Sequence, residues 1–328
     1  MSGFINALPG AVSQGLIWGI MAIGVYITYK LLDIADLTVD GSFCTGGAVF
    51  VVLFTNGVNL FAALLAAVLV GMLAGLATGL LHTFCGIPAI LAGILTQLGL
   101  YSVNMAVMSM KATVAINVTN PDVLDRLLVS LRFVGDVAKG TRSFVRHPIF
   151  VVGLVTAVLI AALYWFFGTE LGSALRATGS NPNMARAQGI NTNFTKVLGL
   201  MLSNGLVALS SGLLAQYQGF IDINSGRGAI VIGLAAVIIG EVLCDALFHK
   251  GCNFAVRLAF VVGGGIAYYI VMTIILWLKL DSNDLKLFTA VIVAIFLAVP
   301  YLQSQARSSF KHAGKMAQKA GKEAEPHA

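Results

Sequence analysis

Charged residues are scarce in this sequence, and their scarcity excludes an ordinary soluble protein. The 328 residues include only 20 basic and 14 acidic ones, and no Asp, Glu, Lys or Arg occurs between Asp40 and Lys111. Soluble domains carry about 25% charged residues, whereas a helix that crosses a bilayer needs about 20 mainly apolar residues. The composition therefore predicts a protein with several membrane-spanning helices.

Sequence signatures of catalysis are also absent. The chain contains no Gly-x-x-x-x-Gly-Lys-[Ser/Thr] loop for nucleotide phosphates, no His-Glu-x-x-His and no Gly-x-Ser-x-Gly. None of its five histidines is paired with another at the spacing of metal ligands. We therefore expect a non-enzymatic chain with no metal site and no cofactor bound by the chain itself.

Cysteine is rare, and a basic leader is missing. The four cysteines form no Cys-x-x-Cys pair, and the ordinary role of those within apolar runs is packing. The first charged residue is Lys30, so the N-terminal apolar run lacks the basic flank of a cleavable signal peptide. We interpret this run as a retained membrane span.

Long apolar segments occupy most of the chain, and they are expected to be helices because backbone groups must be paired inside the hydrocarbon. The segments 43–55 and 228–243 are the shortest, which indicates broken, steeply buried or re-entrant helices that line a cavity. The sequence thus predicts an all-α, polytopic membrane protein with about eight to nine transmembrane segments, including two short or broken helices. The segments are 11–29, 43–55, 59–81, 88–110, 149–167, 194–217, 228–243, 254–278 and 285–303.

The distribution of basic residues predicts the orientation. Residues 307–328 form a basic tail, which the positive-inside tendency assigns to the cytoplasm. Counting four segments back from the tail assigns the polar segment 169–193 to the same side and the loop 111–148 to the outside. That loop carries six basic residues of its own, which conflicts with the tendency and leaves the number of crossings open. We expect a transmembrane domain over 1–306 and a cytoplasmic tail over 307–328.

The polar segment 169–193 predicts a helical hairpin. We expect its first helix to end at Gly179, because glycine commonly follows the last residue of a helix. Asn181 and Pro182 match the N-cap and the first position of a second helix, which we expect to end at Gly189. Such a hairpin either docks into a groove of another protein or lies as an amphipathic structure on the lipid headgroups.

The hairpin sequence resembles a known family. The stretch "GSALRATGSNPNMARAQGINTN" is similar to the cytoplasmic coupling segment of permease subunits in ABC importers of the branched-chain amino acid type. The segments 32–48, 233–243 and 284–300 resemble a poorly characterised subgroup of that family that is associated with amino acids, including aromatic ones. Carried over onto this sequence, the resemblance implies that the ATPase-coupling residues are Gly172, Ala174, Arg176, Ala177, Gly179, Asn181, Ala185, Gly189 and Ile190.

The resemblance also implies partners. Two permease chains, as a homodimer or a heterodimer, would form the pathway in the inner membrane. Separate cytoplasmic ATPase subunits would bind ATP and Mg, and an external solute-binding protein would deliver the solute. Lipid is the remaining partner, and we expect no nucleic acid.

Polar side chains within apolar segments are candidates for the solute pathway, because such side chains are costly in a membrane. Gln97, Tyr101 and Asn104 fall on one face of a helix. They either line the pathway or form hydrogen bonds between helices.

Three further residues are weaker candidates. Glu241 either pairs with a nearby Lys or Arg, which is the commoner outcome, or helps to gate the pathway. Asp40 and Thr38 lie in a connector predicted to be cytoplasmic, where they could contact the coupling segment or a solute, and we favour a structural role.

Other functions remain open on the sequence alone. A stand-alone secondary transporter would need a proton or sodium site and commonly shows inverted repeats, and we find no convincing repeat. A structural membrane protein would not need a docking hairpin. A permease of the same superfamily for sugars or nucleosides would differ only in its solute.

Overall fold

The computed structural model describes residues 2–138, 146–248 and 253–277, together with six scattered positions between 287 and 298. Within these ranges, eight helices are long and apolar enough to cross a membrane, which confirms a polytopic helical protein. The ninth predicted segment, 285–303, lies almost entirely outside the described residues, and the tail 307–328 lies wholly outside them. The eight helices are α1 (Ser2–Tyr26, continued by a π-helical turn, η1, Ile27–Leu31), α2 (Thr38–Thr55), α3 (Leu60–Thr83), α4 (Ala89–Val107), α7 (Pro148–Gly168), α10 (Thr192–Gln218), α11 (Ala229–Phe248) and α12 (Phe254–Trp277).

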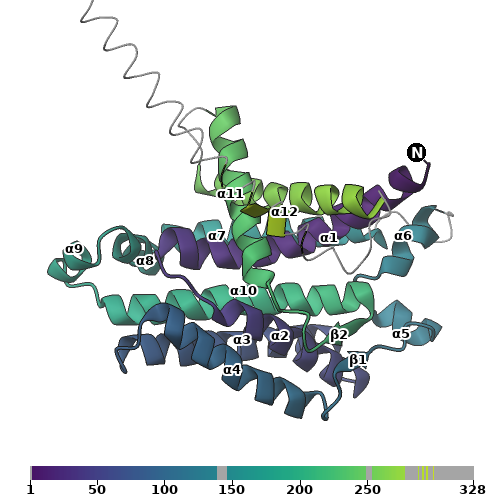
Figure 1. Ribbon diagram of the computed structural model, residues 1–328, viewed down its shortest axis with the longest axis horizontal. Helices are drawn as coiled ribbons and strands as arrows, with labels where there is room; N and C mark the ends of the chain where they lie inside the picture. Colours follow the sequence, from purple (N-terminus) through teal and green to yellow (C-terminus); the bar gives the residue numbers. More distant parts are fainter. Residues whose placement is uncertain are drawn as a thin grey trace, which may run out of the picture. The chain divides into compact units, whose positions relative to one another are not determined.

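Short elements lie at the two ends of the helical bundle. At one end are α8 (Glu170–Ser180) and α9 (Pro182–Ala187), which form the predicted hairpin (Figure 1). At the opposite end are β1 (Thr113–Ala115), β2 (Phe220–Asp222), α5 (Pro121–Arg126) and α6 (Leu131–Ala138). The two strands pair antiparallel, with Val114 opposite Ile221. The segment predicted to be an external loop therefore contains regular structure and is tied to the residues that follow α10.

The long helix α10 lies at the centre of the bundle and packs against α1, α2 and α3. Glycines of α3 permit the closest approach. A Cβ at Gly75 would collide with the Leu200 carbonyl oxygen, and a Cβ at Gly71 would collide with Ala208. Close backbone packing of this kind stabilises helix pairs in lipid, where the hydrophobic drive between helices is weak.

The two segments predicted to be short are longer than expected. Helix α2 has 18 residues and begins at Thr38, because the Asp36 carboxylate accepts the Thr38 backbone N–H at 2.9 Å and so supports the first turn. Helix α11 has 20 residues, and the Asp40 carboxylate accepts backbone N–H groups at its N-terminus. The bounds predicted for these two segments were therefore too narrow, since polar residues that suggested a connector belong to the helix and its cap.

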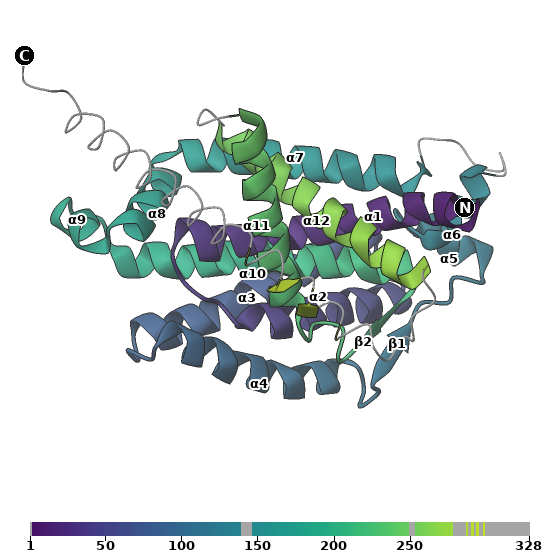
Figure 2. The same ribbon diagram turned by 45° about the horizontal axis from the view of Figure 1, so that its top comes forward.

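Both α2 and α11 nevertheless begin inside the bundle. Ser42, in the second turn of α2, donates a hydrogen bond of 2.6 Å to Asn204, which is the thirteenth of the 27 residues of α10. The first turn of α2 therefore lies near the middle of α10. Since Asp40 in that turn contacts the N-terminus of α11, the segment 219–228 must return from the end of α10 to the same level. Helix α11 leaves this level at a steep angle to α10 (Figure 2).

Candidate functional site

The hairpin α8–α9 is held by local capping interactions. The side-chain oxygen of Asn181 accepts the backbone N–H groups of Asn183 and Met184 at 3.1 and 3.0 Å, so the predicted N-cap is confirmed. Gly189 has a φ of +82°, and the Ile190 N–H reaches back to a carbonyl oxygen of the last turn of α9. This left-handed glycine ends the second helix as predicted.

Gly179 has a different role from the predicted one. Helix α8 continues through Gly179 to Ser180, so the expectation that it ends the helix was wrong. A Cβ at this position would collide with the carbonyl oxygen of Leu31 and lie close to Leu32. Glycine is needed here because the hairpin packs backbone to backbone against the end of η1.

The two arginines of the motif attach the hairpin to its neighbouring helices by hydrogen bonds. Arg176 donates a hydrogen bond of 2.9 Å to the Phe167 carbonyl oxygen at the end of α7. Arg186 donates one of 2.8 Å to the Thr192 hydroxyl at the start of α10. Both side chains therefore fix the hairpin to the membrane helices on either side of it.

Exposure divides the nine motif residues into three groups. A Cβ at the buried Gly172 would collide with the Phe166 carbonyl oxygen, so this residue serves packing. Met184 is 61% exposed at the tip of the hairpin, and sequence reasoning missed it as a contact residue. An apolar side chain within a polar turn is the signal that could have found it. Gly172 and Ala185 are buried, Ala174, Gly179 and Ile190 are half-buried, and Arg176, Ala177, Asn181 and Gly189 are exposed.

A cavity of about 310 Å³ brings together four of the six predicted pathway residues. Its floor is formed by buried residues of α2 and α4, and one wall is formed by the segment that leads into α11. Gln97, Tyr101 and Asn104, which the spacing placed on one face of a helix, all line this cavity. The lining residues are Asp40, Gly41, Cys44, Gln97, Leu98, Tyr101, Asn104, Ile223 and Arg227.

Asp40 holds one wall of the cavity in place. Its two carboxylate oxygens accept the backbone N–H groups of Gly228 and Ile230, each at 3.0 Å. A carboxylate at the N-terminus of a helix is favourable because the unpaired N–H groups there carry partial positive charge. The structural role favoured from the sequence is thus observed, with α11 as the partner.

Arg227 is the charged cavity residue that sequence reasoning missed. Its side chain is exposed at the rim, next to the helix start that Asp40 holds. Among the described residues, no carboxylate lies within ion-pair distance of its guanidinium group. Its sequence context, a polar turn directly before an apolar segment, gave no sign of its place in the cavity.

Thr38 and Glu241 lie outside the cavity lining. The Thr38 hydroxyl pairs with the Thr78 hydroxyl at 2.6 Å, which joins α2 to α3. Glu241 forms a salt bridge of 3.1 Å with Lys30, so the commoner of its two predicted roles is the one observed. Both residues act as contacts between helices.

A buried polar cluster lies beside the cavity. Asn204 donates a hydrogen bond of 2.7 Å to the Asp36 carboxylate in the connector between η1 and α2. Burial raises the pKa of Asp36, while its hydrogen bonds to Thr38 and Asn204 act in the opposite direction. The cluster fixes the level at which α2 begins.

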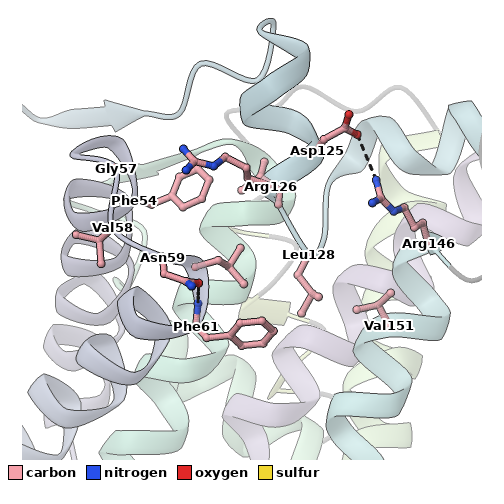
Figure 3. A pocket seen from close by; sticks show the side chains of 12 residues that line it. Phe54, Gly57, Val58, Asn59, Phe61, Asp125, Arg126, Leu128, Arg146 and Val151 are labelled. Atoms are coloured by element: carbon pink, nitrogen blue, oxygen red, sulfur yellow. Dashed lines mark hydrogen bonds and ion pairs between the residues drawn. The ribbon is translucent and has the colours of Figure 1, made fainter.

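The opposite end of the bundle holds a wider depression of about 550 Å³. It is lined by the turn between α2 and α3 and by α5, and Figure 3 shows Arg126 extending toward the Phe54 ring. At its edge, Asp125 and Arg146 form an ion pair of 3.2 Å. This surface joins charged groups to the exposed Phe61 ring.

Comparison with known proteins places the chain in a family. Residues 8–300 match the family model described as the branched-chain amino acid transport system / permease component. The tyrosine transport system permease protein of Clostridioides difficile is 36% identical over 300 residues, 91% of each chain. An uncharacterized protein of Rickettsia prowazekii is 32% identical over 296 residues, 90% of this chain and 98% of its own.

A solved structure described as an inward-facing conformation of a putative metal-chelate type ABC transporter is 16% identical, with a TM-score of 0.46, and covers 91% of this chain and 85% of its own. The family match extends over the eight apolar helices and the hairpin α8–α9. This chain belongs to the family of permease components of branched-chain amino acid transport systems.

Proposed function

We propose that this chain forms one half of the inner-membrane pathway of an ATP-driven importer for an amino acid. Two permease chains would enclose the pathway between them, separate ATPase subunits would bind ATP and Mg, and an external binding protein would supply the solute. The family description and the name of the tyrosine permease support an amino acid as the solute.

The cavity that contains Arg227 is the observation that carries this proposal. It lies at the level of the first turn of α2, midway along α10. An unpaired guanidinium group at that depth is costly against lipid, and charged residues inside membranes therefore face water or protein. A cavity that is polar at mid-depth and open at one side fits half of a hydrated pathway, completed by a second permease chain.

The hairpin supports docking to an ATPase. Its arginines form hydrogen bonds to the end of α7 and the start of α10, and Gly179 contacts the end of η1. A force on the tip would therefore reach three membrane segments. Met184 offers an exposed apolar side chain, which suits insertion into a groove on a partner. We assign ATPase docking to this tip, in place of a structure lying on lipid headgroups.

The wide depression near Arg126 is proposed as part of the docking surface for the external binding protein. It lies at the end of the bundle opposite the hairpin, and it combines charged groups with exposed aromatic side chains. On this proposal the basic tail 307–328 lies with the hairpin in the cytoplasm.

Labelling with a membrane-impermeant thiol reagent tests the orientation. In a Cys85→Ser background, Thr119→Cys should react in intact cells, whereas Met184→Cys should react only after the membrane is permeabilised. Both positions are exposed, so accessibility within the protein is matched. Labelling of Met184→Cys in intact cells would exclude docking to a cytoplasmic ATPase.

Uptake tests the function itself. Cells that produce the chain with its ATPase and binding protein should accumulate labelled L-tyrosine, and substitution of the ATPase catalytic residue should abolish accumulation. Met184→Asp should have the same effect while the amount of chain in the membrane stays unchanged. Uptake that persists without ATP hydrolysis would favour a secondary transporter.

A further inference from the structure

The cavity between α2, α4 and the start of α11 contains a buried acceptor without a donor. Asn104 is 2% exposed, and its side-chain nitrogen donates a long hydrogen bond of 3.4 Å to the Gly41 carbonyl oxygen. Its side-chain oxygen has no hydrogen-bond partner among the described residues. Burial of an unpaired acceptor is unfavourable, so a site that retains one is suited to receive a donor from a bound molecule.

The same cavity contains a cation, Arg227, that has no carboxylate within ion-pair distance among the described residues. Asp40 and Asp222, on the segments beside it, already accept other hydrogen bonds. Asp40 accepts two backbone N–H groups of the α11 start, and Asp222 accepts the Thr113 hydroxyl at 2.7 Å and the Asn224 N–H at 2.8 Å. Since no described carboxylate forms an ion pair with it, the guanidinium group of Arg227 can accept the carboxylate of a bound molecule.

Asp222 keeps its negative charge in this arrangement. Burial acts to raise its pKa, but the hydrogen bonds from Thr113 and Asn224, together with the charge of Arg227, lower the pKa below its usual value. Asp222 thus contributes a fixed charge on the strand that leads into the turn, while its oxygens remain occupied. A bound molecule could therefore supply the anion that pairs with Arg227 and the donor that bonds to the Asn104 oxygen.

We propose that Arg227 binds the carboxylate of a free α-amino acid and that the Asn104 oxygen accepts a hydrogen bond from its α-ammonium group. This inference rests on the proposed function and identifies the side chains that bind the charged groups of the solute. Arginine matches a carboxylate with two parallel hydrogen bonds, and a site that must satisfy both groups rejects analogues that lack either one. Leu98, Tyr101 and Ile223 supply apolar surface for the side chain, and about 310 Å³ suits a small solute.

The test uses the full-length chain in lipid nanodiscs without the binding protein, whose own selectivity would mask the effect. The probes are labelled L-tyrosine, tyramine, which lacks the carboxylate, and 3-(4-hydroxyphenyl)propionate, which lacks the ammonium group. The wild-type chain should bind L-tyrosine at least tenfold more tightly than either analogue. If it binds none of L-tyrosine, L-phenylalanine and L-leucine, or binds tyramine as tightly as L-tyrosine, the inference is wrong.

Variants separate the two groups. Arg227→Gln should lose at least tenfold in affinity for L-tyrosine with no change for tyramine, and Arg227→Lys should keep part of the preference. Asn104→Asp should strengthen tyramine binding, because a carboxylate replaces a neutral acceptor. Arg132→Gln and Ser102→Leu, both exposed and outside the cavity lining, serve as matched controls that should bind like the wild type.

The outcomes distinguish this inference from the proposed function. If Arg227→Gln keeps the full preference for L-tyrosine while uptake still requires ATP hydrolysis, the assignment of the carboxylate site is wrong and the importer proposal stands. If uptake proves independent of ATP while the variants change selectivity as expected, only the importer proposal fails. A monodisperse elution profile and an unchanged helical circular dichroism spectrum confirm that each variant is folded.

Discussion

Gly179→Ala should weaken the attachment of the hairpin to the membrane helices. Replacement of a helical glycine by alanine ordinarily stabilises a helix by about 1 kcal/mol. At Gly179, however, the new methyl group would collide with the Leu31 carbonyl oxygen, which belongs to backbone and cannot rotate away. Overpacking of this kind costs about 1–3 kcal/mol, so the two effects leave a net loss of up to about 2 kcal/mol.

Gly168→Ala is the matched control. Gly168 is also helical and near the hairpin, but a Cβ there would meet no atom within 4 Å. The midpoint of thermal unfolding, measured in detergent, should fall for Gly179→Ala and stay level or rise for Gly168→Ala. ATP-driven uptake should fall in parallel only for Gly179→Ala. Equal or higher stability of Gly179→Ala relative to the wild type would refute the assigned backbone contact.

Three other experiments test the contacts that join the helices. A double-mutant cycle of Lys30→Gln and Glu241→Gln should give a coupling of only about 0.2–1 kcal/mol in the free energy of unfolding, because the two side chains are 46% and 23% exposed. A coupling above about 2 kcal/mol would contradict this expectation. Asp40→Asn should lower stability by about 1.5 kcal/mol or more, since one of the two carboxylate acceptors at the start of α11 is replaced by a donor; an unchanged unfolding midpoint would argue against this cap. For Asp36, burial raises the pKa above 3.8, so the folded chain holds a proton more tightly than the unfolded chain. Its contribution to stability is therefore present below pH 3.8 and is lost as the pH rises through the raised pKa. As the pH rises through the pKa of Asp36, the thermal unfolding midpoint of the wild type should fall, and that of Asp36→Asn should fall less.

Eight of the nine predicted segments are helices in the described residues, and they could be predicted because apolar length is a local property of the sequence. The same holds for the caps at Asn181 and Gly189, where one side chain or one φ angle determines the local structure. The face formed by Gln97, Tyr101 and Asn104 could also be predicted, because helical spacing alone brings these residues together.

Contacts between distant segments could not be predicted. Gly179 has the local context of a helix terminator, and its actual role depends on Leu31, which lies far away in the sequence. Asp40 likewise gave no sign that it would hold the start of α11, since its partners are backbone N–H groups of residues 228 and 230. Arg227 was missed because its depth follows from that tertiary contact, whereas its sequence suggests only a polar turn.

These contacts form a continuous route between the hairpin and the cavity. Gly179 touches the end of η1, the connector that follows contains Asp36, and Asp36 fixes the level at which α2 begins. The first turn of α2 contains Asp40, which holds the turn that carries Arg227. The first step is a backbone contact and the others are hydrogen bonds, so a displacement of the hairpin would also move the connector. If this route transmits the motion, Asp40→Asn should reduce uptake per ATP hydrolysed while hydrolysis itself continues, whereas a loss of hydrolysis and uptake in equal proportion would locate the defect in docking.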